Sequence, residues 1–177
     1  MFAGRHRSAL GLALSLATLL ACSPAIDWRE MQPEGAHLRM AMPCRPASHQ
    51  RSVALAGAPV AMTLLACQIE GGTFAVAFAE LDDPARVGPA LVALIEAARS
   101  NVRGQAVTLS PAQVRGMTPQ PAAQQWRMNG TLPDGRAVVS QGVVFAHGMR
   151  VYQATVVGER PGDDAVRNFL DALAVQP

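Results

Sequence analysis

Hydrophobic and polar residues alternate along several stretches between residues 38 and 81, as they do in strands with one buried face. The stretch LRMAMPC at 38–44 alternates in this way, and a period of two places every second side chain on the same face. Residues 52–56 and 60–69 are extended candidates, joined at AGAP by a predicted hairpin connection. In TFAVAFAEL, Phe and Val on one face alternate with Ala on the other, which predicts close packing on both faces.

The period then changes to that of a helix. Asp83 with Pro84 suits a cap and a first helical position, but Pro89 would interrupt the second turn, so the main helix begins either there or only at Gly88. Gly104 is placed as the stop. The apolar positions with helical spacing are Val87, Leu91, Leu94, Ile95, Ala98 and Val102, and Arg99 and Arg103 lie near the end.

The second half of the chain repeats the order of strands followed by a helix. AVTL at 106–109 is a short strand candidate, followed by a proline-interrupted surface connection to residue 122. QQWRMNGTL, GRAVVSQGVVFA and MRVYQATVVGE are three strands separated by turn signals at 133–135 and at His147-Gly148, which predict an antiparallel meander. An amphipathic helix closes the chain, with Val166, Phe169, Leu170 and Leu173 on its apolar face.

This order predicts one α+β domain over residues 35–177, with an antiparallel β-sheet of about six to seven strands and two main helices packed on it. The layout over roughly residues 35–174 resembles the sandwich of the PsbP-like fold, which also occurs in a Ran-binding nuclear factor and in DcrB-like periplasmic lipoproteins. The resemblance rests on the order of elements and on the aromatic-aliphatic last helix. It implies an accessory or binding role and identifies no site residue.

The first residues of the chain look like an export signal. Arg5 and Arg7 form a basic start, and residues 8–21 are an uncharged run too short to span a bilayer. Leu19, Leu20 and Ala21 then lead directly into Cys22. This pattern resembles the lipobox of bacterial lipoproteins, which implies that residues 1–21 are removed and that Cys22 is acylated. The alternatives are a secreted protein in which Cys22 is incidental, or an uncleaved anchor.

The residues after Cys22 bear on where the chain would be held. In the lipoproteins that the signal resembles, Ser at the position of Ser23 usually permits transfer to the outer membrane, whereas Asp favours the inner one. We therefore expect anchoring on the periplasmic face of the outer membrane, with residues 22–34 as a short tether. Without residues 1–21 the chain has 13 arginines and 13 carboxylates and no arginine block, so no nucleic-acid partner is expected.

Two cysteines, Cys44 and Cys67, remain once Cys22 is assigned to lipid. An exported chain reaches an oxidising compartment, and both residues can lie on neighbouring strands of one sheet, so a disulfide between them is predicted. Two buried free thiols are the alternative.

Catalytic motifs are absent from the sequence: it contains no G-x-S-x-G, H-E-x-x-H or C-x-x-C. His147 is interpreted as a turn residue, and Ser48 beside His49 as surface loop, because neighbouring strand side chains point to opposite faces. The carboxylates at the predicted helix starts are explained by the helix dipole; they are Asp82, Asp83, Asp163 and Asp164.

A copper site is the sharpest chemical alternative. Met40, Met42 and Cys44 share one strand face, with His37 nearby, and sulfur and imidazole donors select Cu(I). Methionine is also an ordinary core residue, and a bridged Cys44 could not serve as a thiolate ligand. We expect the core role, with no metal and no cofactor.

Taken together, the sequence predicts a membrane-anchored periplasmic lipoprotein. Its partners would be the lipid bilayer, through acylated Cys22, and an envelope protein that the sequence does not identify. A small-ligand or metal-binding module, with its site between sheet and helix, is the second hypothesis, and an enzyme is the third.

Overall fold

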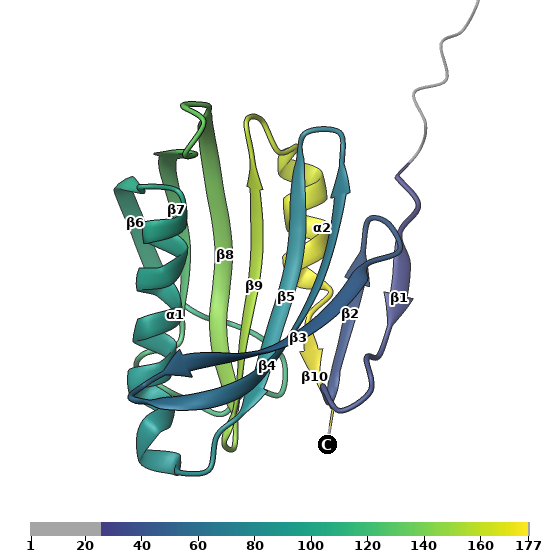
Figure 1. The fold of residues 1–177 in the computed structure, drawn as a ribbon. Helices are drawn as coiled ribbons and strands as arrows, with labels where there is room; N and C mark the ends of the chain where they lie inside the picture. The colour runs from purple at the N-terminus through teal and green to yellow at the C-terminus, as the bar shows by residue number, and fades with distance from the viewer. Residues whose placement is uncertain (1–25, 177) are drawn as a thin grey trace, which may run out of the picture.

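A seven-stranded antiparallel sheet forms the centre of the molecule in the computed structural model, which describes residues 26–176 (Figure 1). Its strand order is β3-β4-β5-β9-β8-β7-β6. The strands are β3 (Ala47–Leu55), β4 (Ala58–Ile69), β5 (Gly72–Glu80), β6 (Gln105–Pro111), β7 (Gln124–Thr131), β8 (Ala137–His147) and β9 (Arg150–Gly158).

A second, small sheet lies beside the large one and is built from the two ends of the described chain. Its order is β1-β2-β10, with β1 (Arg29–Met31), β2 (Leu38–Met42) and β10 (Ala174–Val175), all antiparallel. Only β2 was predicted. Strands of three and two residues are too short to show a period, so the sequence pattern missed β1, within the predicted tether, and β10.

The two helices lie on opposite faces of the large sheet. Helix α1 (Val87–Asn101) covers one face, where Gln153 of β9 donates a hydrogen bond of 3.2 Å from Nε2 to the carbonyl of Leu94. Helix α2 (Asp163–Asp171) and the small sheet cover the other face. There the ring of Phe169 packs edge-on against that of Phe74 on β5, with 5.3 Å between centroids.

The predicted class is confirmed: the chain is α+β, with an antiparallel sheet and two helices. The predicted sandwich is not apparent, because the large and small sheets do not stack as two clear layers. Strand β3 begins five residues earlier than predicted, at Ala47, and β6 extends through Pro111. The β8–β9 hairpin has the predicted two-residue length, but its turn residues are Gly148 and Met149, because His147 pairs with Arg150.

The structure contains both a cap at Asp83 and a separate, later start of the main helix. Asp83 caps a short 3₁₀ helix, η1 (Pro84–Arg86), by accepting a 2.8 Å hydrogen bond from the Ala85 amide, and α1 follows at Val87. At the other end, Arg103 rather than Gly104 takes the left-handed conformation, with φ +46°. Gly104 then donates to the carbonyl of Arg99 at 2.8 Å, as the second residue after the C-cap, here Val102, does in a Schellman motif.

Strand β5 is buried on both faces, as its alternating pattern predicted. Phe74, Val76 and Phe78 are buried towards α2 and the small sheet, whereas Ala77 and Ala79 are buried on the face of α1. A buried tyrosine joins the two sheets: Tyr152 of β9 donates a 2.8 Å hydrogen bond to the carbonyl of Ala36, just before β2. Its ring stacks on Phe145 with 4.7 Å between centroids.

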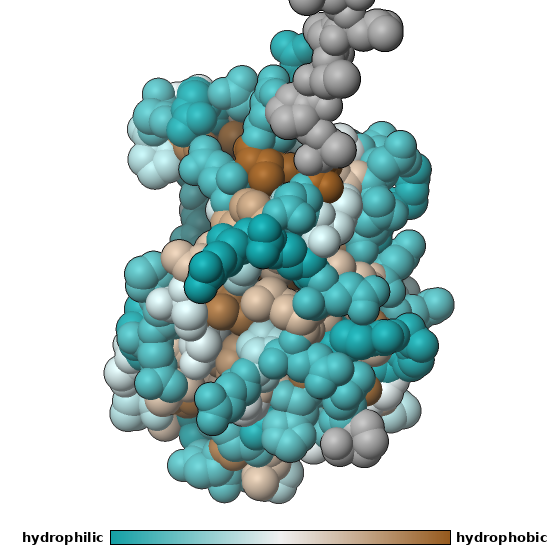
Figure 2. All heavy atoms as spheres, turned by 90° about the vertical axis from the view of Figure 1, so that its right-hand side faces the viewer, coloured by the Kyte–Doolittle hydropathy of each residue, from teal (hydrophilic) through white to brown (hydrophobic). Residues whose placement is uncertain are grey.

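The surface on the side of the small sheet is mainly hydrophilic. Figure 2 shows small hydrophobic areas there, set among polar side chains. The large apolar side chains exposed elsewhere are scattered: Val92 on α1, Leu109 on β6 and Met149 in the β8–β9 turn. Within residues 26–176, none of the helices has the length and apolar character needed to cross a membrane.

Candidate functional site

The disulfide between Cys44 and Cys67 is present, with 6.0 Å between the two Cα atoms. Cys44 follows β2 of the small sheet, and Cys67 lies in β4 of the large sheet. The prediction that the two cysteines lie on neighbouring strands of one sheet is therefore wrong. The disulfide joins the small sheet to the large one. Cys22, the predicted lipid attachment residue, lies outside the described residues.

The residues of the copper hypothesis are placed in the core and at its margin. The side chains of Met40 and Met42 are 1% and 0% exposed and pack in the main hydrophobic cluster. Cys44 is bridged, and His37 is exposed at the start of β2 with a positive φ of 49°. The core role predicted for the methionines is confirmed.

The other polar residues singled out in the sequence lie apart from one another. His147 ends β8, where its Nδ1 lies 2.9 Å from the carbonyl oxygen of Gly116. Ser48 and His49 are exposed on β3, an edge strand rather than a loop. The helix-start carboxylates have local partners: Asp83 caps η1, Asp82 pairs with Arg86, Asp163 with Arg127, and Asp164 with Arg167.

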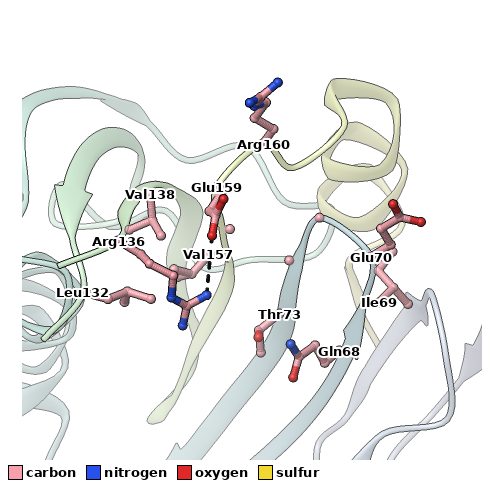
Figure 3. Close-up of a pocket in the computed structure, with 13 residues that line it drawn as sticks. Gln68, Ile69, Glu70, Thr73, Leu132, Arg136, Val138, Val157, Glu159 and Arg160 are labelled. Carbon is pink, nitrogen blue, oxygen red and sulfur yellow. Dashed lines mark ion pairs between the residues drawn. The ribbon is translucent and has the colours of Figure 1, made fainter. Parts of the chain in front are cut away.

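A hollow with a volume of about 840 Å³ lies where two strand turns and the end of a third strand hairpin meet. Its walls come from the β4–β5 turn, the β7–β8 turn and the end of β9 (Figure 3). Close approach of glycines brings two of these walls together: a Cβ on Gly158 would lie 1.8 Å from the carbonyl oxygen of Gly71. Glycines at strand ends can indicate that two backbones approach closely, but the sequence analysis did not interpret these glycines in that way.

Two of the charged residues that line this hollow, Arg136 and Glu159, are paired with each other, and Arg136 also pairs with Asp134 beside it. Arg136 Nε donates to Asp134 at 2.8 Å, and its Nη1 lies 3.6 Å from Glu159. Arg136 holds the pKa of the Asp134 carboxyl below its usual range, and Asp134 in turn raises the pKa of Arg136. In Figure 3, Glu70 and Arg160 point away from the centre of the hollow. The paired groups leave little charge for an ionic ligand.

A smaller hollow of about 220 Å³ adjoins the first on the face of the sheet that carries α1. Val157 lines both. Half-buried Met62 and Leu64 of β4 and Ala75 of β5 contribute to its apolar lining, and Asn101 at the end of α1 and Thr155 of β9 add polar groups. This is the place between sheet and helix where the sequence analysis put a ligand site in its second hypothesis.

Comparison with known proteins adds no assignment: no protein-family model matches this chain, and the search of curated proteins found no significant relative.

Proposed function

We propose that this chain is a lipoprotein held by acylated Cys22 on the periplasmic face of the outer membrane. There its folded domain would bind or support another envelope component without catalysis of its own. The observation that carries this proposal is the order of a basic start, an uncharged run and Leu-Leu-Ala-Cys at residues 19–22. A PsbP-like relationship, including the DcrB-like lipoproteins, is part of the proposal and is in keeping with the antiparallel sheet and two helices.

The disulfide supports an extracytoplasmic site of action. Bridges such as Cys44–Cys67 persist in oxidising compartments, including the bacterial periplasm, and are rare in the cytosol. A chain exported by its first residues would reach such a compartment.

The packing of Trp28 supports a short connection between the anchor and the domain. Its ring contacts that of Phe74 edge-on, with 6.5 Å between centroids. Five residues lie between Cys22 and Trp28, which makes six steps along the chain, and an extended chain spans at most about 3.5 Å per step. An anchored Cys22 would therefore hold the domain within about 20 Å of the lipid surface, with the end bearing the β4–β5 turn nearest the attachment.

The N-terminal peptide of the chain isolated from membranes tests the proposal. Mass spectrometry is expected to show Cys22 as the first residue, carrying a diacylglycerol and a further acyl chain. Cys22→Ala is expected to retain residues 1–21 and to lose the lipid. Recovery of the wild-type chain from the cytosol with Met1 in place would contradict both the anchor and the compartment.

Density-gradient separation of the two membranes tests the choice of membrane. The wild-type chain is expected in the outer-membrane fraction, and Ser23→Asp is expected to shift it to the inner one. Equal distribution of the two variants would remove the basis for the outer-membrane assignment.

Binding of a small molecule is the second candidate function, and the two adjoining hollows on the α1 face favour it. The charge of Arg136 in the larger hollow is paired. Arg51, which lines the smaller hollow, forms no ion pair within residues 26–176, so a partly apolar ligand with a negatively charged group fits best. Native mass spectrometry of the chain released from membranes would show such a molecule as a discrete added mass. A chain free of added mass would favour the partner role.

A further inference from the structure

Strand β3 is an open edge of the seven-stranded sheet. It pairs with β4 through nine consecutive residue pairs without a register shift, and the side chains of residues 47–52 are all exposed. An open edge of this length presents a row of backbone N–H and C=O groups to any extended chain that approaches it.

The opposite edge of the same sheet is built differently. Strand β6 carries a register shift between Gln105 and Thr108 and ends in Pro111. Bulges and prolines are the devices by which proteins stop an edge from pairing. Strand β3 has neither along Ala47–Leu55, so only one of the two edges is left able to accept a further strand.

The turn at the end of β3 fixes which of its backbone groups face outward. Leu55 and Ala58 flank the two-residue turn Ala56-Gly57, in which both residues have positive φ, and such flanking residues form a hydrogen-bonded pair. Residues of an antiparallel ladder alternate between facing the partner strand and facing away from it. The outward groups are therefore those of Ser48, Gln50, Ser52 and Ala54.

The charged residues of the segment that contains β3 and β4 have one sign. From residue 35 to residue 69 the sequence contains Arg39, Arg45 and Arg51 and no Asp or Glu. Arg45 and Arg51 are exposed, and neither forms an ion pair with any residue from 26 to 176. A second copy pairing antiparallel along β3 would bring arginine close to arginine, and like charges across strands are destabilising.

We infer that β3 binds an extended acidic segment of a partner protein, which joins the sheet as an eighth strand. Backbone hydrogen bonds to the four outward residues provide the attachment, and carboxylates of the segment pair with Arg45 and Arg51. The inference rests on the proposed binding role and specifies its surface and the chemistry of the partner.

A capped peptide of alternating Thr and Glu, as long as β3, serves as the probe. Fluorescence anisotropy measures its affinity for the full chain in detergent micelles. The same peptide with Gln in place of Glu is expected to bind about five times more weakly, since an exposed ion pair contributes up to about 1 kcal/mol. Hydrogen exchange locates the contact: bound peptide is expected to slow exchange at the amides of Ser48, Gln50, Ser52 and Ala54.

Two substitutions separate the contribution of backbone hydrogen bonds to peptide affinity from the contribution of charge. Gln50→Pro removes an outward amide without removing a backbone hydrogen bond to β4. Within β3–β4 it loses only the exposed 3.4 Å bond from Gln50 Nε2 to the Thr63 hydroxyl, so it is expected to change the thermal midpoint little while weakening peptide binding about tenfold or more. Arg51→Glu leaves Arg45 opposed by a carboxylate and is expected to abolish the preference for the Glu peptide over a matching Arg peptide. Arg160→Glu, an exposed arginine after β9, is the charge control and is expected to leave the affinity unchanged.

Several results would overturn the inference. These are equal affinity for the Glu and Gln peptides, unchanged exchange along β3, or full binding by folded Gln50→Pro. A dimer in sedimentation that Gln50→Pro abolishes would assign the edge to a second copy. Binding to phosphatidylglycerol vesicles that is lost in Arg51→Glu, without peptide binding, would assign it to a membrane. Each could occur with an acylated, membrane-bound Cys22, so failure here is distinguishable from failure of the proposed function.

Discussion

Gly142 shows how a single missing side chain can be required by the packing of the sheet. It pairs across the strands with Trp126, whose indole N–H donates to the buried hydroxyl of Ser140 at 3.1 Å. A Cβ at position 142 would lie 2.5 Å from the Trp126 ring and 2.3 Å from the carbonyl oxygen of Ala154. Gly142→Ala therefore requires backbone movement, and we expect it to lower the free energy of unfolding by about 2 kcal/mol or more in urea titrations.

Gly88, in the first turn of α1, is the matched control for this substitution. The atoms nearest to a Cβ there are 3.9 Å away, in the side chain of Gln120, so the added methyl meets no clash. Gly88→Ala is expected to raise stability by up to about 1 kcal/mol, because alanine is the better helix former. A change in stability of the same direction for Gly142→Ala and Gly88→Ala would contradict both explanations, the steric clash at position 142 and the helix propensity at position 88.

Tyr152 is expected to make the fold sensitive to alkaline pH. Burial raises the pKa of its hydroxyl, with a smaller opposing effect of Arg150. The unfolded chain releases the phenol proton near pH 10, whereas the folded chain retains it to higher pH. The neutral Tyr152 hydroxyl therefore makes its full contribution to the free energy of unfolding below about pH 10. This contribution is lost as the pH rises through the higher pKa of the folded state.

The measurement is direct because Tyr152 is the chain's one tyrosine. Tyrosinate absorbance is expected to rise at a higher pH in the folded chain than in urea. Tyr152→Phe is expected to cost about 1 kcal/mol near neutral pH, since the carbonyl of Ala36 loses its partner, and to fall less steeply in stability at alkaline pH. Coincident titration curves for the folded and unfolded chains would contradict the effect of burial.

The β3–β4 hairpin is held to the start of α1 by Arg86, whose side chain is 16% exposed. Its guanidinium donates to the carbonyls of Leu55, at 2.8 Å, and Ala56, at 3.3 Å, and pairs with Asp82. Arg86→Met leaves these turn carbonyls without their charged donor. We expect urea titration to show a loss of about 1–3 kcal/mol.

Arg99 provides the comparison on the same helix. It pairs with Glu96 at 2.8 Å, but both side chains are more than half exposed, and exposed pairs contribute little. Arg99→Met is expected to change stability by less than about 0.5 kcal/mol. Similar losses for the two variants would mean that Arg86 acts no differently from a surface arginine.

Elements with several repeats of one period could be predicted from the sequence, and those without could not. Strand β5 alternates along its length, the three strands β7–β9 are separated by turn residues, and the apolar stripe of α1 recurs over its whole length. Strands β1 and β10 have three and two residues, and they exist because both pair with β2. Pairing between chain ends leaves no local pattern to read.

A candidate site could be predicted from the sequence only where a single residue type, such as cysteine, indicates its chemistry without knowledge of the fold. Cysteine chemistry pointed to Cys44 and Cys67, although the sequence did not show that they join different sheets. The larger hollow was not predictable, because its walls come from three turns far apart in the chain. The open edge at β3 depends on strand order, which the local pattern of residues 47–55 does not contain.

The bridge between Cys44 and Cys67 connects the small sheet, where the described chain begins, to β4, the neighbour of the edge strand β3 in the large one. A loop of 23 residues constrains the unfolded chain enough to stabilise the folded one by about 3 kcal/mol. We expect Cys44→Ala with Cys67→Ala, and the reduced wild-type chain, to lose this amount in urea titrations.

The pattern of local opening tells whether the bridge acts only on the unfolded chain or also holds the two sheets together. If the small sheet depends on it, hydrogen exchange along β2 is expected to accelerate in the double variant more than exchange along β8. An equal change on both strands would mean that the bridge acts through the unfolded chain alone. Stability unchanged by both reduction and substitution would contradict any contribution of the bridge. The small sheet would then be held by the core packing of Met40 and Met42 and by the hydrogen bond from Tyr152 to Ala36.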